Sequence, residues 1–159
     1  MCLVATEQNI LNAEKTRKIP GKIYAWKLLY GEASSGKSVV LVSKFWDYIW
    51  KPGWNKSDRQ SLELSTNEKR QLQERDNAQI HRGIHVFLNR KDAMRYCGFS
   101  YKVVRVECYN KDLVARGKRW EHKEAVYMKV FLARDEYKSA LTRKTIERKV
   151  KWLGINGDK

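Results

Sequence analysis

Apolar residues along the chain gather in short runs of aliphatic, β-branched and aromatic residues, which are typical of β-strands. Five such runs predict strands, at residues 22–30, 38–43, 79–88, 101–109 and 124–132. Polar, turn-rich segments separate them, such as the Lys51-Pro52-Gly53-Trp54 turn. The pattern therefore predicts one sheet of about five strands, either mixed or antiparallel.

Three segments between or after these runs predict helices. A short helix is expected at residues 67–75. Another is expected at 90–96, with Asn89 as its N-cap, Asp92 in its first turn and Gly98 after its end. From Arg134 a basic helix is expected to run to residue 153, with a break near residues 142–145 because its apolar positions fall on two different faces.

The N-terminal segment reads as a strand followed by a loose arm at residues 7–20. With the five strands and the two or three helices, this gives an α+β fold. At 159 residues the chain has the length of a single domain with its own core, residues 1–159.

Charge is the strongest feature of the composition. The chain has 33 Lys and Arg against 18 Asp and Glu, a net charge of +15. Ten basic and three acidic residues lie between positions 77 and 120, so the excess belongs to the expected folded centre. Such a charge indicates a partner rich in negative charge, such as nucleic acid, although solubility alone also explains it.

Nothing in the sequence indicates a membrane span or an exported protein. The longest apolar runs, such as residues 39–42, are too short to cross a bilayer, and the N-terminus lacks the basic start of a signal peptide. The three cysteines are therefore expected to be free thiols in a cytoplasm. Their spacing with three scattered histidines forms no zinc motif, and no cofactor is expected.

Residues 31–38 (GEASSGKS) match the P-loop pattern, with Gly31, Gly36, Lys37 and Ser38 at its defining positions. A P-loop needs a strand before it and a helix after it, so that backbone amides at the helix start hold phosphates. The residues that follow, Val39-Val40-Leu41-Val42, favour a strand. We interpret the match as a hairpin loop.

Two weak candidates for catalysis remain. Removal of Met1 leaves Cys2 as an N-terminal nucleophile with its own amine as base, whereas the alternative is a small buried strand residue. On an extended strand, His81 and His85 share a face with Gly83 between them. The two histidines are then roughly 13 Å apart, too far to chelate one metal, but they line a pocket or else are solvated on an edge strand.

Aromatic and basic residues alternate in the segment from residue 44 to residue 59, which includes Trp46, Trp50 and Trp54. Aromatic faces beside cations suit nucleic acid, because bases stack on the rings while phosphates meet the charges. The alternative is that these residues belong to the core, since a chain with six Trp must bury part of them.

Several segments together resemble a family of small uncharacterised proteins from bacteriophages and bacteria. They are the opening MCLVA, the KPGWN segment at residues 51–55 and the GIHVF segment at residues 83–87. The resemblance implies an accessory protein that acts on host or defence machinery, in the host cytoplasm if it is encoded by a phage. It implies no catalytic residue.

The leading hypothesis is a non-enzymatic protein that binds a phosphate-rich ligand, either nucleic acid or a nucleotide signal. The residues expected to bind it are Arg82, Arg95, Arg105, Arg116, Lys118, Arg119, Trp46, Trp50 and Trp54. One alternative is an enzyme on a nucleotide-type substrate that uses Cys2 or the His81/His85 face. Another is an inhibitor that docks on an acidic host protein. The oligomeric state stays open.

Overall fold

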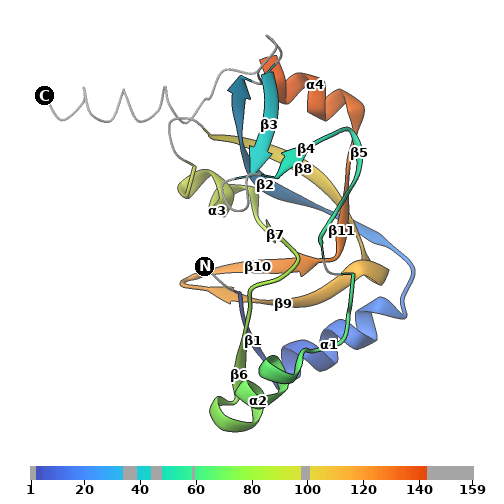
Figure 1. Ribbon diagram of the computed structural model, residues 1–159, viewed down its shortest axis with the longest axis vertical. Helices are drawn as coiled ribbons and strands as arrows, with labels where there is room; N and C mark the ends of the chain where they lie inside the picture. Colours follow the sequence, from blue (N-terminus) through green and yellow to red (C-terminus); the bar gives the residue numbers. More distant parts are fainter. Residues whose placement is uncertain (1–2, 34–38, 44–47, 59, 98–100, 143–159) are drawn as a thin grey trace, which may run out of the picture.

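The computed structural model describes residues 3–33, 39–43, 48–58, 60–97 and 101–142. Within these ranges the chain forms one antiparallel sheet of eleven strands and four α-helices (Figure 1). The strands are β1 (Leu3–Thr6), β2 (Lys22–Ala33), β3 (Val39–Ser43), β4 (Ile49–Trp50), β5 (Gly53–Lys56), β6 (Asn77–Ile80), β7 (Ile84–Phe87), β8 (Tyr101–Tyr109), β9 (Leu113–Arg119), β10 (His122–Tyr127) and β11 (Lys129–Leu132). The helices are α1 (Glu7–Arg17), α2 (Thr66–Arg75), α3 (Arg90–Arg95) and α4 (Arg134–Thr142), with a short 3-10 turn at Asn110–Asp112.

The strands follow the order β5-β11-β8-β2-β7-β10-β9-β1-β6, while β3 pairs with β2 and β4. Only Met128 separates β10 from β11, and the chain turns sharply there (Figure 1). As a result β10 pairs with β7 and β9, whereas β11 pairs with β8 and β5. The chain itself therefore connects the two ends of the paired series β11–β8–β2–β7–β10 through Met128, and the sheet wraps around the main core.

The side chains that alternate toward the inner side of the strands fill this core. Residues at every second position of β2 and β8, such as Ala25, Leu29, Val104 and Val106, are buried together with β-strand residues from the other side of the wrapped sheet. A second cluster lies under β1, β6 and α2, and a third lies between α3 and the outer side of β2 and β8. None of the helices described is long and apolar enough to cross a membrane.

The α+β class is confirmed, but the expected sheet of about five strands with two or three helices is wrong. Strands β4, β5 and β9 were not predicted, and two predicted strands are each divided. Gly83 adopts φ +84° between β6 and β7, so residues 79–88 change sheet neighbours instead of forming one strand. Residues 124–132 bend at Met128, because their two halves pair with different strands.

Other elements agree better with the sequence. Residues 101–109 form β8 with the predicted bounds, and the bounds of α2 and α3 differ from the predicted ones by one residue. The Asn89 side chain accepts a hydrogen bond from the Lys91 amide, which confirms it as the N-cap of α3. Residues 7–17, expected to be a loose arm, instead form α1 behind a Thr6–Asn9 capping box. The basic helix expected at 134–153 is seen as α4 up to Thr142, and the remainder lies outside the described residues.

Candidate nucleic-acid interface

Four neighbouring strands, β5, β11, β8 and β2, have an outer surface that differs in chemistry from their inner one. In β11, Val130 and Leu132 are buried in the core, so Lys129 and Phe131 point outward. Phe131 lies opposite Trp54 of β5 in the strand register. One aromatic pair and one lysine therefore stand on the outside of this half of the surface.

Strands β8 and β2 continue the same surface. Phe131 pairs with Glu107, which in turn pairs with Tyr24 of β2. Tyr109 stands opposite Lys22 in the same register. Because side chains alternate along a strand, Arg105, Glu107 and Tyr109 share a face, as do Lys22 and Tyr24.

We call this surface the aromatic face. It consists of the rings of Tyr24, Trp54, Tyr109 and Phe131, the cations of Lys22, Lys56, Arg105 and Lys129, and the carboxylate of Glu107. None of the four rings belongs to the hydrophobic clusters that the described residues form. Tyr24 is 47% exposed, and the other three are half-buried.

The rings contact one another rather than lying isolated. The Trp54 ring centre is 5.3 Å from that of Tyr109 and 5.4 Å from that of Phe131. Such distances are typical of favourable aromatic pairs, which restrict the rings and keep their outer faces in fixed positions.

Cations lie over the same rings. The Arg105 guanidinium is 4.6 Å from the Tyr24 ring centre, and Lys129 Nζ is 4.6 Å from that of Trp54. Lys22 Nζ is 5.6 Å from the Tyr24 ring and 2.5 Å from Glu107 Oε1. The hydrogen bond to Glu107 raises the pKa of Lys22. The Lys22–Glu107 pair is neutral overall, so the net positive charge of the face comes from Lys56, Arg105 and Lys129, of which Arg105 and Lys129 lie over rings. Glu136 accepts a hydrogen bond from the Arg105 amide, and the charge of Asp112 acts on Lys129, so carboxylates lie near two of these cations.

The residues expected to bind the ligand divide between this face and other places. Arg105 and Trp54 belong to the aromatic face. Arg116 and Lys118 line a separate cavity beside α1. Arg95 is exposed in the last turn of α3. Trp46 lies outside the described residues.

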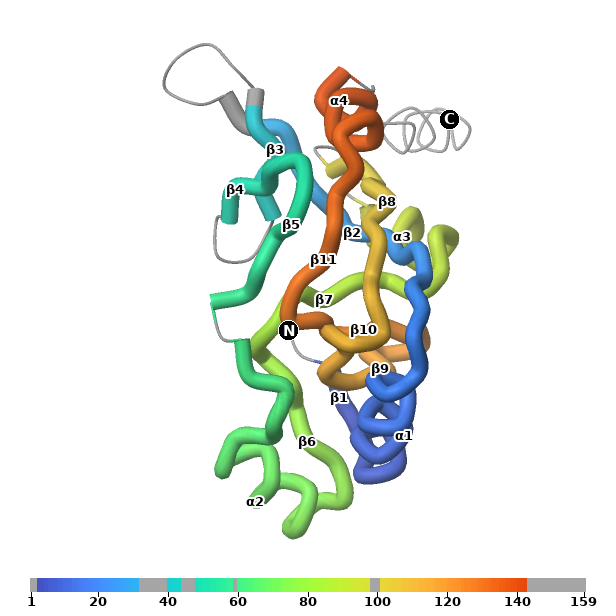
Figure 2. The backbone as a smooth tube through the Cα atoms, turned by 90° about the vertical axis from the view of Figure 1, so that its right-hand side faces the viewer, coloured from blue at the N-terminus to red at the C-terminus, as the bar shows by residue number. Residues whose placement is uncertain are grey.

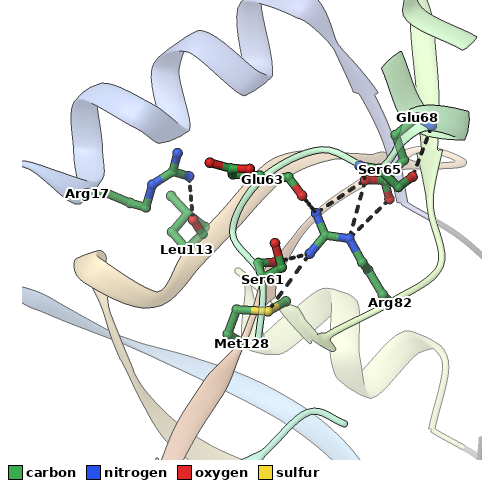
Figure 3. Close-up of polar contacts among 8 residues, drawn as sticks. All are labelled: Arg17, Ser61, Glu63, Ser65, Glu68, Arg82, Leu113 and Met128. Carbon is green, nitrogen blue, oxygen red and sulfur yellow. Dashed lines mark hydrogen bonds and ion pairs between the residues drawn. The ribbon is translucent and has the colours of Figure 1, made fainter. Parts of the chain in front are cut away.

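Arg82 is occupied by contacts inside the protein (Figure 3). Its guanidinium donates hydrogen bonds to the backbone oxygens of Ser61 and Glu63, and it forms an ion pair of 3.2 Å with Glu68. Glu68 also accepts the Ser65 amide in the capping box of α2. Arg82 therefore fixes the segment before α2 to the sheet, and we leave it out of the proposal below.

Trp50 and Arg119 also have their contacts inside the protein. Trp50 is 2% exposed and packs edge-on against Tyr48 in the core. Arg119 Nε lies 2.6 Å from Glu124 Oε2, and the same oxygen lies 2.6 Å from His122 Nε2. Glu124 is 2% exposed, so this group is an internal charge cluster at the end of the β9–β10 hairpin.

The two histidines do not share a strand. His81 is exposed in the turn before β7, and His85 lies within β7. Desolvation, followed by the charges of Lys27 and Arg119, lowers the pKa of His85 to about 3. His85 is therefore neutral at physiological pH, and the described residues contain no group of His, Cys, Asp and Glu suited to a metal ion.

The P-loop-like segment leads into a strand. Gly31 lies within β2 and pairs with Leu41 of β3, which runs antiparallel to β2. The helix that a P-loop requires after its Lys and Ser is thus replaced by β3. Gly36, Lys37 and Ser38 lie outside the described residues, as does Cys2.

Of the nine residues of the aromatic face, Trp54 and Arg105 were expected to bind the ligand, and Lys56 belongs to the aromatic and basic segment 44–59. The other six were not predicted: Lys22, Tyr24, Glu107, Tyr109, Lys129 and Phe131. All of them except Lys22 stand next to a buried residue in the chain, as Tyr109 stands next to Cys108, so period-two patterning separates them from the core. The sequence holds no signal that these strands are neighbours. No protein-family model matches the chain, and neither a curated protein nor a solved structure is significantly similar to it.

Proposed function

We propose that the protein binds single-stranded nucleic acid on its aromatic face. The observation that carries the proposal is the gathering of four partly exposed rings and four cations on one outer surface of β5, β11, β8 and β2. Rings arranged on a sheet surface stack with unpaired bases, while cations beside them meet the phosphates of the same strand.

Single strands fit this surface better than duplexes. In a duplex the base faces are stacked on each other and cannot reach Trp54 or Tyr24, whereas an unpaired base can lie flat on either ring. Stacking accepts every base, so we expect weak dependence on sequence. The proposal includes what the resemblance to small phage proteins implies, namely that the protein acts in the cytoplasm of a host.

The direct test is fluorescence anisotropy with a labelled 20-nucleotide oligo-dT at low salt. Replacing Trp54 with Ala removes a central ring, and stacking of about 1–3 kcal/mol per base corresponds to roughly 5- to 150-fold weaker binding. Tyr24→Ala is a second variant, because this more exposed ring contributes little to the packing.

The matched control is Trp120→Ala. Trp120 is 65% exposed and lies 5.4 Å from the Arg119 guanidinium, so it is also a tryptophan beside an arginine, but on the β9–β10 turn. Oligonucleotide affinity should be unchanged in this variant. Equal losses in Trp54→Ala and Trp120→Ala would contradict a site on the aromatic face.

Salt dependence gives an independent measure. If Lys56, Arg105 and Lys129 each contact a phosphate, the plot of log affinity against log salt concentration should have a slope of about −2. Lys129→Gln should make the slope shallower by about 0.7, whereas Lys69→Gln on α2 should not. Failure to bind any single strand at low salt would refute the proposal, and the charge would then point to an acidic protein partner.

A further inference from the structure

A cavity of about 380 Å³ lies between α1 and the β9–β10 hairpin, on elements that do not contribute to the aromatic face. Its polar lining consists of Asn9, Asn12, Thr16, Arg116, Lys118 and Lys123, and its other lining residues are apolar or glycine. Figure 2 shows α1 running beside β9 and β1 at this end of the molecule.

The composition of α1 explains why the cavity exists. Asn9, Asn12, Ala13 and Thr16 occupy one face of the helix, at the spacing of successive turns. These side chains are short, so the helix face does not fill the space above the strands as Leu or Ile would. Both ends of the helix are fixed, by the Thr6–Asn9 capping box and by the hydrogen bond from Arg17 to the Leu113 carbonyl (Figure 3).

Positive charge gathers on the opposite wall. Lys118 and Lys123 are directly opposite each other in the β9–β10 register, and Arg116 lies two residues away on the same face. Like charges at such a position repel each other. Within the described residues none of the three forms an ion pair, and no carboxylate lines the cavity.

The remaining polar groups favour an anion as well. Asn9 Oδ1 accepts the Thr6 amide and Asn12 Oδ1 accepts Gln8 Nε2, so both side-chain carbonyls are occupied. Each side-chain NH₂ group is left to donate. The Arg116 side chain interacts with the Tyr127 hydroxyl, and it forms no ion pair within the described part of the chain.

We propose that this cavity binds a small organic phosphate of about nucleotide size. The phosphate lies between Lys118, Lys123 and Arg116, where it offsets their repulsion and accepts hydrogen bonds from the asparagine amides. The organic part packs against Leu88 and Leu113. The volume lies within the range of small-molecule sites, about 300–1,000 Å³.

Isothermal titration calorimetry of the full chain at low salt tests this site with three probes: AMP, inorganic phosphate and adenosine. AMP should bind one to one and more tightly than inorganic phosphate, and adenosine should not bind. Lys118→Gln and Lys123→Gln should each weaken AMP at least tenfold, because each removes a charge-assisted hydrogen bond. Absence of binding by both AMP and inorganic phosphate, or unchanged AMP affinity in both variants, would overturn the proposal.

Two controls separate this site from the aromatic face and from loss of folding. Lys129→Gln should bind AMP normally while its affinity for oligo-dT falls, and Lys123→Gln should show the reverse. Without ligand, Lys123→Gln should unfold at the same or a higher temperature than the natural protein, because it relieves the Lys118–Lys123 repulsion. A lower unfolding temperature would contradict the charge argument on which the site rests.

Discussion

Lys27 is a lysine at an inward position of the sheet. It lies on β2 between Ala25 and Leu29, which alternate with it and are fully buried. Its Nζ donates a hydrogen bond of 2.7 Å to the His85 carbonyl. Desolvation lowers the pKa of Lys27 from 10.5 to about 8, against the opposing attraction of Glu124. At neutral pH the folded protein therefore holds a buried ammonium group at a cost in stability.

The size and sign of that cost follow from linkage. A folded pKa of about 8 against 10.5 in the unfolded chain corresponds to about 3 kcal/mol. Because the folded pKa is depressed, the favourable contribution is complete above pH 10.5 and is lost as the pH falls through about 8. Between pH 8 and pH 9 the contribution of Lys27 to the free energy of unfolding should rise by about 1 kcal/mol.

Replacing Lys27 with Met keeps the length of the side chain and removes the charge. At pH 7 this variant should be more stable than the natural protein by about 1–3 kcal/mol, the lost hydrogen bond reducing the gain. The assay is urea unfolding of both proteins at pH 7, 8 and 9. The stability difference between them should shrink by about 1 kcal/mol from pH 8 to pH 9.

Comparing the two proteins removes other titrations from the result. Burial raises the pKa of Cys108 from 9.0 to about 12, which opposes Lys27 above pH 9 but acts equally in both proteins. Lys69→Met, at an exposed position of α2, is the control and should change stability little at any pH. If Lys27→Met is destabilised at pH 7, or the difference is independent of pH, the reasoning from desolvation is refuted.

Three further changes test the packing and charge of the same sheet, each by urea unfolding. Gly117→Ala should cost about 3 kcal/mol, because the new Cβ would lie 2.2 Å from the Val4 carbonyl oxygen; a loss below 0.5 kcal/mol would contradict this contact. Glu124→Gln should lower the free energy of unfolding by about 3 kcal/mol, because it leaves Arg119 without its buried counter-charge. Unchanged stability in this variant would contradict a need of Arg119 for that counter-charge. Desolvation lowers the pKa of His85 from 6.5 to about 3, so the contribution of His85 to the free energy of unfolding is lost as the pH falls below 6.5. Between pH 6.5 and pH 4 the natural protein should therefore lose about 3 kcal/mol of stability relative to His85→Gln. Equal pH dependence of the free energy of unfolding in the two proteins would refute the reasoning.

Local signals in the sequence were sufficient for some elements. Strand β8 is a nine-residue run rich in valine and aromatic residues that alternates from Val104 to Tyr109, and helix α3 begins after an asparagine whose side chain caps it. Both elements were therefore predicted nearly to the residue. Helix α1 was missed because it buries only Ile10 and Ala13 and so lacks an apolar stripe. Strand β9 was missed because LVARGKR combines a glycine with three basic residues.

The aromatic face illustrates what a single sequence does not contain. Trp54 and Tyr109 are far apart along the chain, and their ring contact depends on β11 lying between β5 and β8. That neighbour relation arises from the turn at Met128, which the uninterrupted apolar run of residues 124–132 conceals. Pairing between distant strands is set by the whole core, so alternation identifies outward residues without showing which of them meet.

The basic residues behind the net charge of +15 have different surroundings, and these surroundings indicate different roles. Arg82 and Arg119 are bound to buried carboxylates and stabilise the fold. Arg105 and Lys129 lie over rings, where they can meet a phosphate next to a stacked base. Lys118 and Lys123 face each other in a cavity, where a small anion relieves their repulsion. If all of the excess positive charge contacted phosphates, the plot of log affinity against log salt concentration would have a slope several times steeper than about −2. The measured slope therefore distinguishes binding at one defined face from nonspecific electrostatic binding over the whole surface.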